Sequence, residues 1–129
     1  MFEIIGSPLR MLIVASLLMI SSVTSLTAAE LIMLEEDGCP WCELWRKEVG
    51  VIYSKTDEGK IAPLRIVDIH ETLPDDLQFL TKGGFTPTFV LVDKGKEIGR
   101  IRGYPGESFF WGLLSQMIEK LTKTGNTSS

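Results

Sequence analysis

The only two cysteines in the chain, Cys39 and Cys42, are separated by two residues at the predicted start of a helix. At this spacing the two thiols can close a small disulfide ring. The first thiol lies against the unpaired N–H groups and the positive end of the helix dipole, which favours its thiolate. Because the thiolate is the attacking species in thiol–disulfide exchange, we assign Cys39 as the nucleophile and Cys42 as the resolving cysteine. Pro40 has no N–H to donate, so it suits the first helical turn and holds the helix-start conformation.

Three other uses of such a cysteine pair are a structural disulfide, a zinc site and a copper(I) site. A structural disulfide usually closes a long loop, and a ring this short restricts the unfolded chain little. A zinc site normally needs a second pair of ligands, whereas the sole histidine, His70, has no second ligand nearby in the sequence. Copper(I) bound by Cys39, Cys42 and a methionine remains an alternative, which would make the protein a metal chaperone. The leading hypothesis requires neither a metal nor an organic cofactor.

Length and charge limit the remaining classes of function. The chain has 129 residues, 13 Lys and Arg against 17 Asp and Glu, and a formal net charge of −4. This length predicts one domain, and the 44% hydrophobic content is that of an ordinary globular protein. No basic run occurs of the kind that nucleic-acid binders carry, so we expect no nucleic-acid partner.

The first 29 residues have the layout of an export signal. Arg10 precedes an apolar run over residues 11–20, and a Ser/Thr/Ala-rich segment ends at Ala29. We expect residues 1–29 to be a secretory signal peptide, with an uncleaved membrane anchor as the alternative. The domain is then delivered to a compartment where disulfides persist. We expect this domain to cover residues 30–122 and a polar tail to cover residues 123–129.

Hydrophobic patterns predict the element order strand, helix, strand, helix, strand, strand, helix. These elements cover residues 31–34, 40–50, 64–69, 75–81, 88–92, 97–102 and 109–121. A right-handed crossover makes the first two strands parallel, and the tight turn at 93–96 makes the last two an antiparallel hairpin. We therefore expect an α/β fold with a four-stranded mixed sheet and helices on both faces. The polar run 56–60 is expected to be a turn, and the residues assigned to the core include Trp45, Phe89, Phe109 and Phe110.

The Cys39-Pro40-Trp41-Cys42 motif after a buried strand, together with Thr86-Pro87 before a strand and hairpin, resembles the thioredoxin superfamily. In that family the proline is cis and faces the disulfide, and the residue before it pairs by its backbone with the substrate. The resemblance therefore gives substrate-binding roles to Thr86 and Pro87. It also places Gly103 and Tyr104 beside the dithiol, as a third wall of the substrate surface. We expect Trp41, between the cysteines, to be exposed and to contact the partner.

One position departs from the family pattern. Family thioredoxins carry a buried carboxylate six residues before the first cysteine, where it assists deprotonation of the resolving thiol, and this chain has Met33 there. Cys42 therefore lacks that helper. Glu35 or Glu36 could act through water, although acids at the end of a strand are more simply explained as solvated.

Three segments extend the resemblance to the periplasmic SoxS-type thioredoxins of bacterial sulfur-oxidation systems: residues 35–42, 85–90 and 103–111. This resemblance implies a periplasmic protein-disulfide reductase that keeps a thiol on a client protein usable, the client being a sulfur-carrier protein. A membrane thiol–disulfide transporter would supply the electrons. Because the direction of exchange depends on reduction potential and not on the motif, a disulfide oxidase, an isomerase and a cytochrome-maturation thioredoxin remain alternatives.

Overall fold

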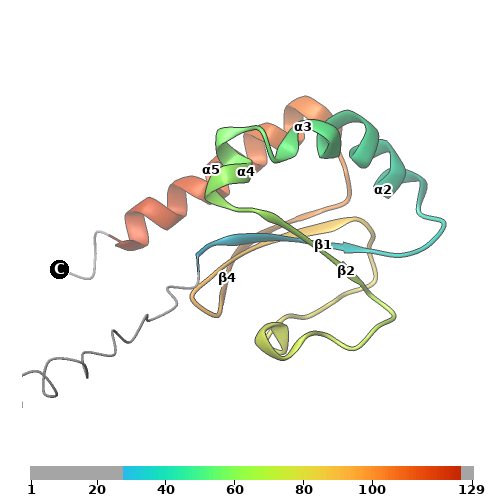
Figure 1. Ribbon diagram of the computed structural model, residues 1–129, viewed down its shortest axis with the longest axis horizontal. Helices are drawn as coiled ribbons and strands as arrows, with labels where there is room; N and C mark the ends of the chain where they lie inside the picture. The colour runs from blue at the N-terminus through green and yellow to red at the C-terminus, as the bar shows by residue number, and fades with distance from the viewer. Residues whose placement is uncertain (1–27, 126–129) are drawn as a thin grey trace, which may run out of the picture.

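The computed structural model describes residues 28–125, and its centre is a four-stranded sheet with strand order β2-β1-β3-β4. The strands are β1 (Glu30–Glu35), β2 (Leu64–Asp68), β3 (Thr88–Asp93) and β4 (Lys96–Arg102). β1 pairs parallel to β2 and antiparallel to β3, which forms an antiparallel hairpin with β4 (Figure 1). The predicted mixed sheet is therefore confirmed. The predicted signal peptide, apart from Ala28 and Ala29, lies outside the described residues, as do residues 126–129 of the predicted tail.

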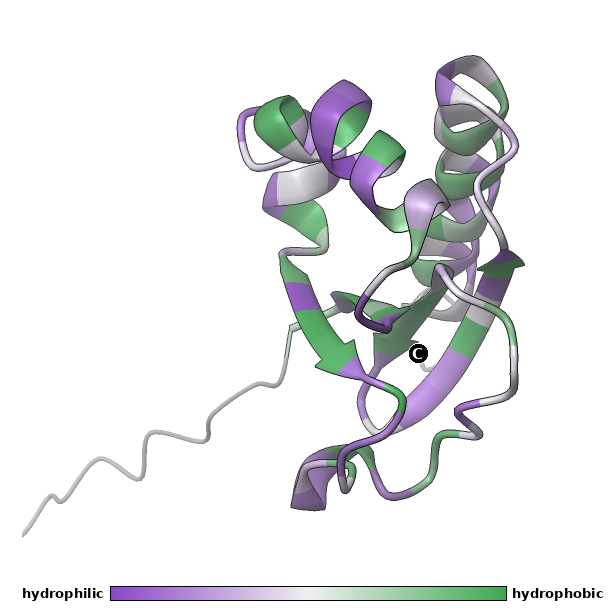
Figure 2. Cartoon of the chain, turned by 90° about the vertical axis from the view of Figure 1, so that its right-hand side faces the viewer, coloured by the Kyte–Doolittle hydropathy of each residue, from purple (hydrophilic) through white to green (hydrophobic). Residues whose placement is uncertain are grey.

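Among residues 28–125, all the α-helices lie on one face of the sheet (Figure 1). They are α2 (Pro40–Trp45), α3 (Val51–Tyr53), α4 (Asp57–Ile61) and α5 (Glu107–Gly125), with a π-helical turn, η2 (Arg46–Gly50), between α2 and α3. The rings of Trp45, Phe89 and Phe110 meet beneath them with centroids 4.9–5.7 Å apart, and all three side chains are fully buried. Figure 2 shows in green the hydrophobic stretches of these strands and helices. The core assignment of these three aromatic residues is confirmed.

The opposite face carries no α-helix among residues 28–125, contrary to prediction. The helix expected at 75–81 is one 3₁₀ turn, η3 (Asp75–Leu77), within an otherwise irregular segment. Its inward side chains, Leu77 and Leu80, pack against the sheet as expected, but they are only three residues apart. That spacing fits the three residues per turn of a 3₁₀ helix. The remaining apolar side chain of the segment, Phe79, is 43% exposed, so it adds nothing to a buried helical stripe.

The first helix continues beyond Gly50, where the sequence predicted its end. Gly50 has right-handed helical angles (φ −55°, ψ −38°), and the chain remains helical to Tyr53. A Cβ at this position would lie 3.2 Å from the Trp45 ring. Gly50 therefore makes room for the buried indole and does not terminate the helix.

The run Thr56–Lys60 was predicted as a turn, but it begins the short helix α4. The Thr56 hydroxyl accepts a hydrogen bond from the Gly59 N–H at 3.0 Å, which caps the helix. Gly59 packs so closely on the preceding helix that a Cβ there would lie 1.9 Å from the Tyr53 carbonyl oxygen. Only glycine fits this approach.

The last helix differs from prediction at both ends. It reaches Gly125, inside the predicted tail, and its buried side chains are Phe110, Leu114 and Met117. Phe109 was assigned to the core but is 71% exposed, because one residue's rotation of about 100° takes it off the stripe centred on Phe110. Within residues 28–125 no helix has the length and apolar character required to cross a membrane.

Candidate functional site

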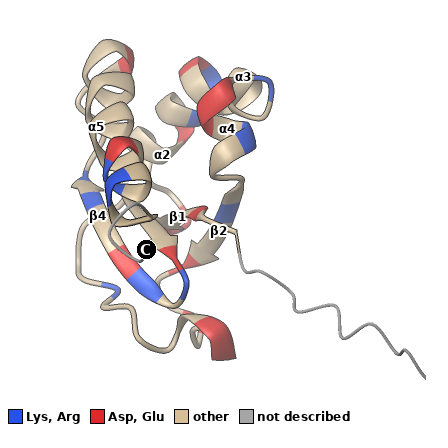
Figure 3. Cartoon of the chain, turned by 90° about the vertical axis from the view of Figure 1, so that its left-hand side faces the viewer, with Lys and Arg blue, Asp and Glu red and all other residues tan. Residues whose placement is uncertain are grey.

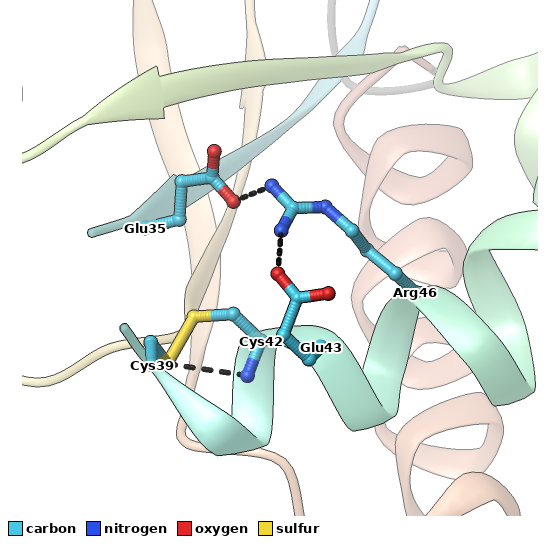
Figure 4. A network of polar contacts seen from close by, with 5 residues as sticks. All are labelled: Glu35, Cys39, Cys42, Glu43 and Arg46. Carbon is cyan, nitrogen blue, oxygen red and sulfur yellow. Dashed lines mark hydrogen bonds and ion pairs between the residues drawn. A yellow bond between two sulfur atoms is a disulfide. The ribbon is translucent and has the colours of Figure 1, made fainter. Parts of the chain in front are cut away.

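Cys39 and Cys42 are joined by a disulfide at the start of α2, with their Cα atoms 5.3 Å apart. Cys39 is the N-cap residue, and its sulfur accepts a hydrogen bond from the Cys42 N–H at 3.1 Å (Figure 4). Cys39 retains 7% exposure, whereas Cys42 is fully buried. The two sulfurs therefore occupy different environments: one at the surface beside a helical N–H group, and the other beneath it.

The residues between the cysteines face outward. Pro40 occupies the first turn of α2 as the sequence predicted. Trp41 is 58% exposed, which agrees with the expected position of its side chain. An exposed indole next to a disulfide offers a large apolar contact at low entropic cost to a binding partner.

The segment containing Thr86 and Pro87 is tied to the cysteine-containing loop by side chains. The Thr86–Pro87 peptide bond is cis, and Pro87 is buried while Thr86 is half-buried. The Thr86 hydroxyl donates to Glu36 Oε1 at 2.8 Å, and Glu36 lies in the loop that leads from β1 to Cys39. The Gly103 N–H donates to the Pro87 carbonyl at 2.7 Å, which joins the turn after β4 to the same segment.

Tyr104 differs from its expected place on the substrate surface. Its side chain is only 7% exposed and packs against Phe110, with ring centroids 6.2 Å apart. Its hydroxyl donates to Glu48 Oε2 at 2.5 Å. Burial and the neighbouring Glu48 carboxylate raise the pKa of Tyr104 well above its usual range. The Tyr104 side chain therefore packs inside the domain, beneath the turn that contains it. Of the two residues, half-buried Gly103 is the one that reaches the surface.

Both acids considered as helpers of Cys42 already have partners. Glu35 forms an ion pair with Arg46, whose guanidinium also contacts Glu43 Oε1 at 2.8 Å, so the three charges lie beside the disulfide (Figure 4). Glu36 accepts hydrogen bonds from Thr86 and from His70 Nε2, the latter at 2.9 Å, and these bonds hold the pKa of Glu36 below its ordinary value.

Met33 is fully buried in the same core cluster as both cysteines, so the departure from the family pattern places an apolar side chain there. Sequence reasoning missed Arg46, although its spacing of three residues from Glu43 is that of a helical ion pair. It also missed the Glu36 bonds, which join residues distant in the sequence. Among residues 28–125, no group of three or more His, Cys, Asp or Glu side chains could hold a metal ion.

A search of solved structures decides the family. The chain is similar to the periplasmic thioredoxin SoxS from Paracoccus pantotrophus, with 41% identity, a TM-score of 0.69, and coverage of 72% of this chain and 98% of that chain. The protein belongs to the thioredoxin superfamily. As a thioredoxin-like oxidoreductase, it uses the Cys39–Cys42 pair as its redox-active disulfide.

More distant thioredoxins share the fold alone. Fasciola hepatica thioredoxin has 19% identity and a TM-score of 0.54, with coverage of 70% of this chain and 81% of that chain. Malassezia sympodialis thioredoxin has 20% identity and a TM-score of 0.52, with coverage of 71% of this chain and 79% of that chain. No family model and no curated protein matches this thioredoxin-like chain.

Proposed function

We propose that this protein is a periplasmic protein-disulfide reductase in which Cys39 attacks the client and Cys42 resolves the mixed disulfide. The observation that carries the proposal is the unequal environment of the two sulfurs. Cys39 Sγ accepts the Cys42 N–H at 3.1 Å and is partly accessible, whereas Cys42 is fully buried. A helical N–H group directed at the sulfur stabilises a thiolate there, and only an accessible thiolate can reach a client disulfide.

The proposed reaction passes two electrons to the client in two exchanges. The Cys39 thiolate attacks one sulfur of the client disulfide, the client S–S bond breaks, and the other client sulfur leaves as a thiolate that takes a proton from solvent. The Cys42 thiol then loses its proton to solvent, and the resulting thiolate attacks Cys39 Sγ, which breaks the mixed disulfide and releases the second client sulfur as a thiolate. The product is the Cys39–Cys42 disulfide, the form that the structure contains.

The residues around the disulfide suit a client in extended conformation. Exposed Trp41 supplies an apolar contact, and the half-buried residues Thr86 and Gly103 border the cis Pro87. We assign backbone pairing with the client to Thr86, as the family resemblance implies. The Glu36 bond to the Thr86 hydroxyl holds this residue in place before the client arrives.

Compartment and partners belong to the same proposal. The export-signal layout of residues 1–29 and the periplasmic relative both support a periplasmic location. In that location a membrane thiol–disulfide transporter would return electrons to Cys39 and Cys42. The client we propose is a protein whose cysteine must be kept reduced, and a sulfur-carrier protein fits the SoxS-type resemblance.

The direction of the reaction is tested by equilibrating the purified domain with glutathione or dithiothreitol redox buffers and quantifying the oxidised fraction. A reduction potential near or below about −200 mV is expected for a reductase, because it must donate electrons to client disulfides. A value near about −120 mV, typical of a strong oxidant, would overturn the proposed direction.

A further inference from the structure

An open pocket of about 430 Å³ lies between β4 and the segment 81–85, outside the disulfide site. Its charged lining residues are Lys82, Arg100, Arg102 and Glu97, and its lining also includes Gly83 and Gly84. Three basic side chains against one acidic side chain give the pocket a positive balance, although the whole chain carries a net charge of −4. Figure 3 marks the basic positions of β4 in blue.

The pocket adjoins the segment that we assign to client binding. Arg102 pairs across the hairpin with Thr88, and the next residue, Gly103, donates its N–H to the Pro87 carbonyl. On the other side, the pocket is lined by Phe85, which directly precedes Thr86 and is 67% exposed. A polypeptide lying along Thr86 therefore has this pocket as its neighbour.

The three basic groups are not equally available. Arg100 is engaged by Glu97 and donates to the Thr81 carbonyl at 3.1 Å, while Lys82 donates to the Glu71 carbonyl at 2.7 Å. Arg102 is exposed, and its guanidinium has no hydrogen bond or ion pair with any residue in the range 28–125. A free guanidinium is suited to bidentate binding of a carboxylate.

We propose that this pocket binds an acidic segment of the client polypeptide, with Arg102 as the principal contact. The inference rests on the proposed function, which it deepens by giving the client a chemical character: aspartate or glutamate residues close to its reducible disulfide. Complementary charge of this kind raises the encounter rate and selects among partners. Trp41 and the cis-proline segment then contact clients of any charge, whereas the pocket favours clients with acidic residues near the disulfide.

Binding is tested without redox chemistry by ¹⁵N NMR titration of the oxidised protein with a short capped peptide containing several glutamates and with its glutamine analogue. The glutamate peptide should shift the amide signals of Gly83, Gly84 and Arg102. The Arg102→Gln variant should bind it about two- to fivefold more weakly, as expected for one exposed charge pair, and the effect should shrink at high salt. The Lys55→Gln variant removes one exposed positive charge outside the pocket and should bind as the wild type does. Equal shifts with both peptides, or unchanged affinity in Arg102→Gln, would overturn the proposal.

A kinetic measurement separates this inference from the proposed function. Two disulfide-containing peptides that differ only in glutamate or glutamine beside the cysteine are reduced by the dithiol protein. The wild type should favour the acidic peptide in kcat/KM, and Arg102→Gln should lower that preference by about two- to fivefold. Glutamate-selective binding without reduction of either peptide would contradict the reductase and support the pocket. Reduction of both peptides at equal rates would support the reductase and contradict the pocket.

Discussion

Met33 provides a sharp test of how the buried side of the disulfide site is built. Its side chain is fully buried and lies between Ile66 and Phe89 in the sheet register. Members of the family that carry a carboxylate at this position use it to assist the resolving cysteine, so Met33→Asp introduces that group into this chain. The structure gives the new carboxylate an apolar setting in the same core cluster as Cys42.

The size of the effect follows from this burial. Replacing buried methionine by a short polar side chain forfeits about 1.5–3 kcal/mol of apolar burial. A buried polar group without a partner costs about 1–3 kcal/mol more, so the total loss is about 2.5–6 kcal/mol, against a typical free energy of unfolding of about 5–15 kcal/mol. Burial disfavours the ionised form, which raises the pKa of the new carboxyl in the folded state above its unfolded value of about 3.9. The loss is therefore smallest below about pH 4 and grows as the pH rises towards 7.

Urea unfolding between pH 4 and pH 7 measures this loss, with Met33→Asn and Met33→Leu as matched controls. Met33→Asn is polar but cannot ionise, so its loss should not grow with pH in the same way. Met33→Leu conserves volume and should cost less than about 1.5 kcal/mol. If the unfolding free energies of Met33→Asp and Met33→Asn run parallel at every pH, the carboxyl is hydrated and the reasoning is refuted.

Three further predictions concern the Glu36 carboxyl, two helical glycines and Trp41. The lowered pKa of Glu36 should appear as a ¹³C carboxyl titration midpoint below 4.5. The ionised Glu36 carboxylate should stabilise the folded state at pH values above its unfolded pKa, and this stabilisation should be lost as the pH falls through the folded-state midpoint. Thr86→Val should raise the midpoint, because the Thr86 hydrogen bond is the largest cause of the shift, and an unchanged midpoint would contradict this assignment. Gly59→Ala should destabilise the fold by about 1–3 kcal/mol, because the added methyl group overpacks the contact with Tyr53. The control Gly112→Ala, where the added methyl group meets no atom on α5, should stabilise the fold by roughly 0.5–1 kcal/mol. Similar urea midpoints for the two variants would contradict this prediction. Trp41→Ala should lower kcat/KM for client reduction by about fivefold or more. The control Val51→Ala, which truncates an exposed apolar residue on α3, should leave kcat/KM unchanged. Equal effects of the two variants would show that Trp41 does not contact the client.

The sequence predicted the strands and the redox motif because their determinants are local. Three of the strands contain short apolar or β-branched runs bounded by polar turns, and the fourth, β4, follows the tight turn at 93–96. The cysteines stand beside a proline that marks the first turn of a helix. The order of elements then determined which strands run parallel, since a crossover and a hairpin each allow one arrangement.

The errors arose where tertiary packing overrides a local pattern. Gly50 is the usual residue for a helix end, yet here it accommodates the Trp45 ring within a continuing helix. The family resemblance placed Tyr104 on the substrate surface, but the Phe110 ring and the Glu48 carboxylate hold its side chain inside. The Glu36–Thr86 hydrogen bond joins residues 50 positions apart, so no local pattern could indicate it.

The proposed division of roles between the cysteines is tested most directly by trapping the mixed disulfide. Reduced Cys42→Ser and Cys39→Ser variants are each mixed with a disulfide-containing peptide, and the covalent adduct is quantified by mass spectrometry over time. We predict that Cys42→Ser accumulates a stable adduct through Cys39, because the attacking sulfur is present and the resolving one is absent. Cys39→Ser should react far more slowly, since Cys42 is fully buried. Adduct formation at the same rate in both variants, or faster in Cys39→Ser, would contradict the account.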